Sequence, residues 1–179
     1  MGLLGVFMPS VLDDNKLKLL ALLSLYTKPA GDDEYDHYIK NYVLLCIIYD
    51  LIIRGVLDYD YSSRLILWRG AYVFMNVSQE ALVDLDFLVE KGLLKKIKFS
   101  TQGHLYVVGY RVTETGREVI RGYPEKLEEV RKALACECGE IMSIAIEEDG
   151  AYYVCCGEKK KIGCLSTEDV GYEAEPIIV

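Results

Sequence analysis

Hydrophobic and polar positions follow their most regular pattern between residues 76 and 91. Apolar side chains recur there at helical spacing, which predicts a helix with one buried face. These apolar positions are Ala81, Leu82, Leu85, Leu88 and Val89. Asn76, together with Gln79, can cap the start of this helix, and Gly92 suits the left-handed residue that ends one.

The pattern then changes from helical to alternating. Residues 93–99 and 104–112 alternate apolar and polar side chains, and a short loop containing Gly103 joins the two runs. This combination predicts a β-hairpin. Thr113 follows and can cap a further helix, so the segment is predicted to fold as helix, hairpin and helix.

The first part of the chain carries two more helical patterns. Asp13-Asp14-Asn15 offers a cap for a helix that should stop near Pro29. Residues 38–54 are apolar almost all round, as expected for a helix packed on several sides. Residues 56–68 then predict two strands around a polar turn at 60–63.

Two motifs resemble each other across a spacing of 37 residues. LIIRGVL at 51–57 and LVEKGLL at 88–94 each end a helix at a glycine and precede a predicted hairpin. They indicate either two helix-plus-hairpin units in tandem or two independent uses of a common turn. Downstream, Pro124 starts a helix with one apolar stripe, which can pair two subunits or pack on the core of its own chain.

Composition limits the choice of function. The 179 residues are 51% hydrophobic, so the chain can bury a substantial core. Its net charge of −8 repels nucleic acid unless the basic residues gather on one face. The longest apolar run, 42–53, is too short to span a bilayer, and no secretory signal is visible at the start. We therefore expect a cytoplasmic protein without membrane contact.

Cysteines provide the strongest chemical signal. Five of the six lie between residues 136 and 164, whereas Cys46 lies in the apolar helix and is interpreted as an inert core residue. Two Cys-Gly turns at one end of a hairpin can present thiolates to a tetrahedral metal. The predicted ligands of a structural Zn²⁺ are Cys136, Cys138, Cys164 and one of Cys155 and Cys156, with Cys156 preferred.

The cysteine segment resembles a zinc ribbon, with departures from its pattern. The usual Cys-x-x-Cys pairs are replaced here by Cys136-x-Cys138 and by the adjacent Cys155-Cys156. Disulfides, free or redox-active thiols and an iron–sulfur centre are alternative interpretations.

The helix–hairpin–helix segment resembles the winged-helix module of transcriptional regulators, through LVEKGLL before the hairpin and YRVTETGR after it. The expected fold is α+β, with three parts. Residues 1–70 form an N-terminal helical region with a β-hairpin, or a first winged-helix unit. Residues 71–135 form the winged-helix domain, and 136–179 a zinc-ribbon-like lobe with an acidic tail.

The resemblance does not by itself predict DNA binding. The predicted outer face of helix 76–91 carries four carboxylates, which would oppose docking in a DNA groove. Val83 and Phe87 on that face favour a protein contact. The hairpin is locally basic, through Lys95, Lys96, Lys98 and Arg111, and favours either wing-led DNA contact or an ordinary solvated edge strand.

No catalytic motif is found, so we expect a non-enzymatic protein. A winged helix followed by a zinc ribbon resembles archaeal and other transcription machinery, which implies a transcription-associated regulator that contacts DNA through its wing. The alternatives are a protein-interaction adaptor or homodimer without nucleic acid, and a thiol redox sensor.

Overall fold

The computed structural model describes residues 12–30, 37–102 and 104–166. The predicted acidic tail after Ser166 lies outside these ranges. The helices are α1 (Asp14–Tyr26), α2 (Asn41–Ile53), α3 (Gln79–Glu90), α4 (Glu114–Arg121) and α5 (Pro124–Leu134). The strands are β1 (Ile39–Lys40), β2 (Ser62–Trp68), β3 (Ala71–Val77), β4 (Leu94–Thr101), β5 (His104–Val112), β6 (Ser143–Glu147), β7 (Gly150–Cys155), β8 (Glu158–Ile162) and β9 (Leu165–Ser166). The fold is therefore α+β, as predicted.

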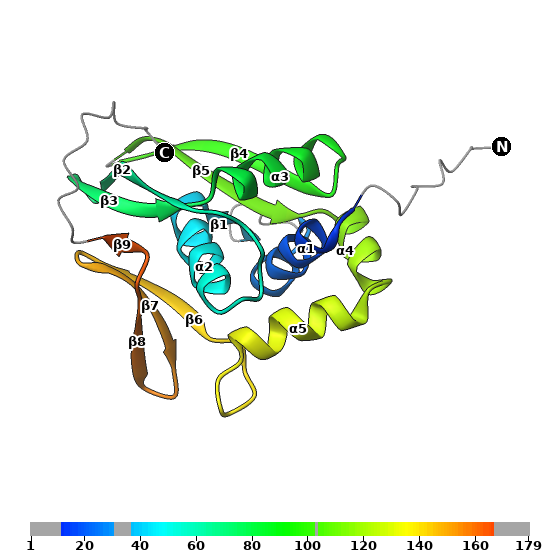
Figure 1. The fold of residues 1–179 in the computed structure, drawn as a ribbon. Coiled ribbons are helices and arrows are strands. Elements are labelled where there is room, and N and C mark those ends of the chain that lie inside the picture. The colour runs from blue at the N-terminus through cyan, green and yellow to red at the C-terminus, as the bar shows by residue number, and fades with distance from the viewer. Residues whose placement is uncertain (1–11, 31–36, 103, 167–179) are drawn as a thin grey trace.

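The described strands form three small antiparallel sheets, in the orders β1-β5-β4, β2-β3-β9 and β6-β7-β8. Figure 1 shows α2 in the middle of the molecule, with the two hairpins β2–β3 and β4–β5 on one side and the β6–β8 sheet on another. The short strand β9 lies beside β3, so the end of the described chain returns to the first hairpin.

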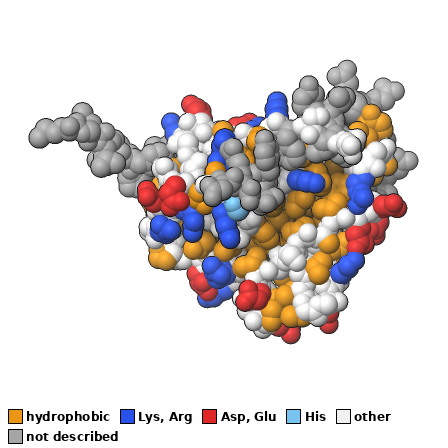
Figure 2. All heavy atoms as spheres, turned by 180° about the vertical axis from the view of Figure 1, so that it is seen from behind, with side chains coloured by type: hydrophobic (Ala, Val, Ile, Leu, Met, Phe, Trp, Pro, Cys, Tyr) orange, Lys and Arg blue, Asp and Glu red, His pale blue; other side chains and the backbone are white. Residues whose placement is uncertain are grey.

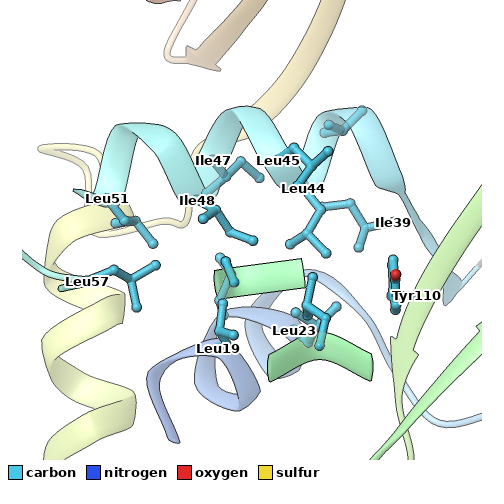
Figure 3. Packing of buried hydrophobic residues seen from close by; sticks show 14 of the residues in the cluster. Leu19, Leu23, Ile39, Leu44, Leu45, Ile47, Ile48, Leu51, Leu57 and Tyr110 are labelled. Atoms are coloured by element: carbon cyan, nitrogen blue, oxygen red, sulfur yellow. The ribbon is translucent and has the colours of Figure 1, made fainter. Parts of the chain in front are cut away.

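Helix α2 is the centre of the hydrophobic core. Its apolar side chains face α1 and β5, and Figure 3 shows Leu44 and Ile48 pointing toward Leu19 and Leu23, with Tyr110 beside them. Leu44, Leu19 and Leu23 have no exposed surface. Full burial of a leucine side chain is worth about 1.5–3 kcal/mol, which explains why a helix apolar on all sides forms the central element.

The two motifs that resemble each other adopt the same helix-ending structure. Gly55 follows α2 with φ +71° and Gly92 follows α3 with φ +72°. The next N–H donates back to a carbonyl in the last turn, from Val56 to Leu51 and from Leu93 to Leu88, at 2.9 Å in both cases. The glycine N–H donates to a second carbonyl, from Gly55 to Ile52 and from Gly92 to Val89. A cap with these two bonds needs a residue in the left-handed conformation, which glycine adopts without a steric penalty.

The first hairpin does not lie where the sequence predicted it. Its strands cover residues 62–77, and its turn is at Arg69-Gly70, both with positive φ, as a two-residue hairpin loop requires. In the segment predicted as a turn, 60–63, the Asp60 N–H donates to the Glu80 carboxylate of α3 at 2.8 Å, and Ser62 and Ser63 already belong to β2. Asn76 is consequently in β3 and does not cap α3.

The caps of the remaining helices agree more closely with prediction. The hydroxyl of Ser78 caps α3 by accepting from the Ala81 N–H. The predicted caps Asp13 and Thr113 accept from backbone N–H groups of α1 and α4. Pro124 begins α5, as predicted.

Helix α5 packs on its own chain. Its apolar stripe buries Val130 and Leu134 in the core. Beside this contact, Lys18 of α1 forms ion pairs with Glu129 of α5 at 2.8 Å and with Asp14 at 2.7 Å. Of the two roles that the sequence left open for this stripe, packing on the chain's own core is the one observed.

Surface chemistry is uneven on the face opposite that of Figure 1. Figure 2 shows hydrophobic side chains gathered in the middle of this face, with charged side chains toward its margins. None of the described helices is both long and apolar enough to cross a membrane.

Candidate metal centre

The first cysteine pair lies on a turn between α5 and β6. The N–H of Gly139 donates to the Cys136 carbonyl and the N–H of Cys136 donates to the Glu140 carbonyl, both at 2.8 Å. Gly139 has φ +89°, a conformation that glycine supplies at low cost. These bonds fold the segment back on itself and bring Cys136 and Cys138 to the same side.

The second pair lies where β7 turns into β8. Cys155 ends β7, Cys156 has φ +53° and Gly157 has φ +78°. Neighbouring side chains in a strand point to opposite faces, but the left-handed backbone at Cys156 changes this direction. Both cysteines therefore join the cluster, whereas the sequence predicted that only one would.

The four sulfur atoms lie within 4.8 Å of one another. The sulfur–sulfur distances are 3.4 Å for Cys138–Cys155, 3.7 Å for Cys155–Cys156 and 3.9 Å for Cys136–Cys156. Tetrahedral coordination with metal–sulfur bonds of about 2.3 Å places the sulfur atoms about 3.8 Å apart. These three distances match that spacing and are too long for a disulfide, whose sulfurs are about 2.05 Å apart.

Protonation differs within the cluster. The backbone amide of Glu140 and the neighbouring thiols lower the pKa of the Cys138 thiol to about 7. Hydrogen bonds with the other cysteines raise the pKa of Cys155 and of Cys156. Because thiolates are the metal ligands, a bound cation must displace protons from the cluster, and its affinity should rise with pH.

Basic side chains outnumber acidic ones beside the cluster. It borders a hollow of about 560 Å³, whose walls include Arg54, Lys132, Lys159 and Lys160 as well as Glu137 and Glu158. A metal held by four thiolates carries net negative charge, which nearby cations stabilise. The donor set and its surroundings therefore fit a tetrahedral, thiolate-bound metal.

Cys164 does not belong to this cluster. It forms a disulfide with Cys46 of α2, with 5.1 Å between the two Cα atoms, and both residues are fully buried. The sequence assigned Cys164 as a metal ligand, which is wrong. Cys46 lies in the core as predicted, but it is bonded to Cys164 and is not an inert thiol. The physical reason is the turn after β8, which directs Cys164 toward β3, where its carbonyl accepts from the Asn76 N–H at 2.9 Å.

Polar contacts also fix the β6–β8 sheet to the rest of the chain. The Tyr153 hydroxyl of β7 donates to the Asp50 carboxylate of α2 at 2.7 Å, and Arg54 pairs with the same carboxylate. The Trp68 indole of β2 donates to the Glu147 carbonyl at 3.1 Å. These contacts join elements that are far apart in the sequence, so no local sequence pattern predicts them.

One signal for the disulfide was present in the cysteine count. The C-terminal segment holds five cysteines, whereas a tetrahedral site uses four. A cysteine left over from a site needs another partner, and Cys46 is the one cysteine outside the segment. Counting ligands would thus have predicted that Cys46 pairs with one of the five cysteines, although not with which one.

The four predicted nucleic-acid contacts have different environments. Lys95 and Lys98 are exposed on β4, whereas Lys96 pairs with the Asp86 carboxylate of α3 at 2.9 Å. Arg111 is only 7% exposed, with its guanidinium 5.4 Å from the ring centre of Tyr38. Arg111 therefore does not contribute to an exposed basic surface, contrary to the prediction.

The two residues of the predicted apolar pair on α3 also have different environments. Val83 is 59% exposed, but Phe87 is half-buried, with the ammonium groups of Lys16 and Lys91 at 5.4 and 5.3 Å from its ring centre. Asp84, expected on the outer face, instead accepts from the Tyr59 hydroxyl at 2.7 Å. The outer face of α3 thus presents less apolar surface and fewer free carboxylates than the helical pattern suggested.

Comparisons with known proteins identify one family. Neither the curated proteins nor the solved structures contain a match to the chain. The sequence profile of the uncharacterized protein MJ1567 family matches residues 15–161, which include α2, both long hairpins and the four clustered cysteines. The chain belongs to the MJ1567 family.

Proposed function

We propose that the chain is a non-enzymatic regulatory protein with a winged-helix-like body, a structural zinc site and a protein partner. The observation that carries the proposal is the sheet β1-β5-β4 with α1, α2 and α3 packed beside it, in which α3 leads directly into the long β4–β5 hairpin. This arrangement supports the resemblance to winged-helix regulators. Fold alone does not define function, so the choice of partner rests on surface chemistry.

The cysteine cluster supports a structural role for the metal. Four protein thiolates complete a tetrahedral shell, whereas catalytic zinc keeps one position for water or substrate. Zinc is the metal that most often occupies all-cysteine tetrahedral sites of this kind, apart from iron–sulfur centres. The proposed metal therefore stabilises the β6–β8 sheet and activates no substrate.

Charge on α3 and on the hairpin favours protein over DNA as the partner. Glu80, Asp86 and Glu90 are exposed on α3. On the hairpin, Asp86 compensates Lys96, and Arg111 is buried. A duplex placed against this side would meet carboxylates with few unpaired cations to offset them.

Duplex DNA is the second candidate, because Lys95 and Lys98 are exposed on β4. A mobility-shift experiment with a 30-base-pair duplex at about 50 mM salt separates the two candidates, since DNA binding through phosphates weakens steeply with added salt. We expect no shift with the wild-type protein. A salt-sensitive shift that is lost in the Lys95→Gln/Lys98→Gln variant would establish DNA contact and overturn the choice of a protein partner.

A second copy of the chain is the simplest protein partner to test. Sedimentation velocity over a wide range of concentrations should show a dimer that Val83→Asp abolishes, since Val83 is an exposed apolar residue on the outer face of α3. Leu67→Asp, at an exposed apolar position on β2, is the matched control. A chain that remains monomeric at every concentration would contradict self-association.

A further inference from the structure

A second cavity lies between the two helix-plus-hairpin units, apart from the cysteines. Its volume is about 300 Å³. The first unit contributes residues of α2, β2 and β3, and the second contributes residues of α3, β4 and β5. Pockets that bind small molecules start at about 300 Å³, so this cavity suits a ligand smaller than a typical drug.

The walls of this cavity are mostly apolar. Leu45 and Ile66 come from the first unit, and Leu82 and Val108 from the second. Tyr110 also lines the cavity, and burial raises the pKa of its hydroxyl despite the neighbouring Lys96 ammonium. The walls would therefore hold the apolar body of a ligand and exclude water from it.

Cations prevail among the charged residues of this cavity. Arg64, Lys96 and Lys98 face a single carboxylate, that of Asp86, in a chain whose net charge is −8. Asp86 already pairs with Lys96 at 2.9 Å. Arg64 reaches only the Ser62 hydroxyl, at 3.4 Å, and Lys98 forms no ion pair within the described part of the chain. Two positive charges are thus left for an anionic group.

Asn41 supplies the polar contact on the inner side. It is the first residue of α2, lines the cavity and is only 7% exposed. Its side-chain oxygen has no hydrogen-bond partner among the described residues. A buried acceptor without a donor costs about 1–3 kcal/mol, so a ligand that donates to it regains stabilisation that the protein alone lacks.

We propose that this cavity binds a small carboxylate with a compact apolar ring, whose carboxylate lies between Lys98 and Arg64 and whose N–H or O–H donates to Asn41. The ring fills the space between Leu45 and Leu82. Each part of the ligand matches one property of the cavity. The carboxylate matches the positive charge at one side, the ring matches the apolar walls, and the N–H or O–H matches the unpaired acceptor. Since the walls come from both units, the ligand joins the two hairpins.

Isothermal titration of the full-length, zinc-loaded protein with indole-3-acetate tests this proposal. The probe carries a carboxylate, an apolar ring and one ring N–H. We expect saturable binding that weakens about tenfold or more for Lys98→Gln, because a charge-assisted contact is lost. Arg131→Gln, which changes an exposed cation of α5 outside the walls of both hollows described above, is the matched control and should bind as the wild type does.

Two analogues test the two polar ends separately. 3-Methylindole lacks the carboxylate and should bind at least tenfold more weakly to the wild type, with no further loss in Lys98→Gln. 1-Methylindole-3-acetate lacks the N–H and should lose affinity for the wild type but much less for Asn41→Ser. Amide NMR shifts should cluster at α2, α3 and β4.

Three results would overturn the proposal. The first is the absence of saturable binding of indole-3-acetate up to millimolar concentrations. The second is equal affinity in Lys98→Gln and Arg131→Gln. The third is a set of shifted amides confined to the β6–β8 sheet, which would assign binding to the basic residues around the cysteines.

Discussion

The two sulfur sites of this protein both use cysteines of the C-terminal segment but differ in burial and in the elements that form them. The four-cysteine cluster forms at two turns, and its residues are half-buried or exposed. The Cys46–Cys164 disulfide is fully buried and joins residues 118 positions apart. Local backbone geometry builds the first site, whereas the packing of distant elements builds the second. Cysteine chemistry thus depends on what surrounds the thiol more than on its position in a motif.

Removal of a cluster cysteine should have the largest effect. Cys138→Ser is expected to weaken zinc binding by more than about 100-fold, because loss of a ligand exceeds the 10–100-fold cost of losing a second-shell partner. Zinc content and chelator competition measure this change. Cys155→Ser and Cys156→Ser should behave alike if both residues are ligands.

Cys164→Ser is the control for this experiment. It removes a cysteine that the sequence assigned to the metal but that the structure places in the disulfide. Zinc content should therefore stay at the wild-type value. A Cys164→Ser protein that loses its metal while Cys155→Ser keeps it would restore the ligand set predicted from the sequence.

Removal of the disulfide should reduce global stability without affecting the metal. In the chain-entropy model, closing a loop of this length is worth about 4–5 kcal/mol. The free energy of unfolding measured in urea should be lower for the Cys46→Ala/Cys164→Ala variant than for the wild type, by up to this amount. The wild type in dithiothreitol should approach the variant, and the variant itself should not respond to the reductant.

Thiol counting provides an independent check on the same contrast. Denatured, metal-free protein should show four reactive thiols before reduction and six afterwards. Six thiols before reduction would mean that Cys46 and Cys164 are not joined.

A smaller effect is expected where the polar contacts meet α2. Tyr153 is 3% exposed, and its hydroxyl donates to Asp50. Tyr153→Phe should cost about 1 kcal/mol of unfolding free energy, the typical net value of one hydrogen bond, and leave zinc content unchanged. Tyr152→Phe, whose hydroxyl bonds to Asp149 on the exposed side of the same strand, is the matched control.

The smallest effect should come from Asp14, away from both sulfur sites. Burial opposes its charge, but hydrogen bonds from Lys126 and Lys18 outweigh this and lower its pKa. A lowered pKa stabilises the fold above the unfolded value of about 3.9, and the contribution is lost as pH falls through the folded value. Asp14→Asn should therefore cost less than about 1 kcal/mol at pH 7, and progressively less as the pH falls below the unfolded value, in urea titrations.

Local patterns predicted the helices, the long β4–β5 hairpin and the position of the first cysteines in the cluster. They failed where a side chain found a distant partner. Residues 60–63 have the composition of a turn, but the Asp60 N–H bonds to Glu80 of α3 and Ser62 already begins β2, and the actual turn at Arg69-Gly70 was missed. Composition alone cannot distinguish a polar segment that faces solvent from one that contacts another helix.

The cluster shows the same limit at the level of single residues. Adjacent cysteines rarely bind one metal together, so the sequence favoured only one of Cys155 and Cys156. In a regular strand their side chains would point apart. The left-handed backbone at Cys156 removes this restriction. A positive φ at a residue other than glycine is rare, and no local pattern predicts it.

The disulfide also has a topological consequence. It closes a covalent ring that contains all the residues between Cys46 and Cys164, including both long hairpins. A protease that cuts once inside this ring yields two fragments that stay linked, and they separate on a gel only after reduction. Under oxidising conditions the intact mass would therefore rise by only the mass of one water, although the backbone is broken.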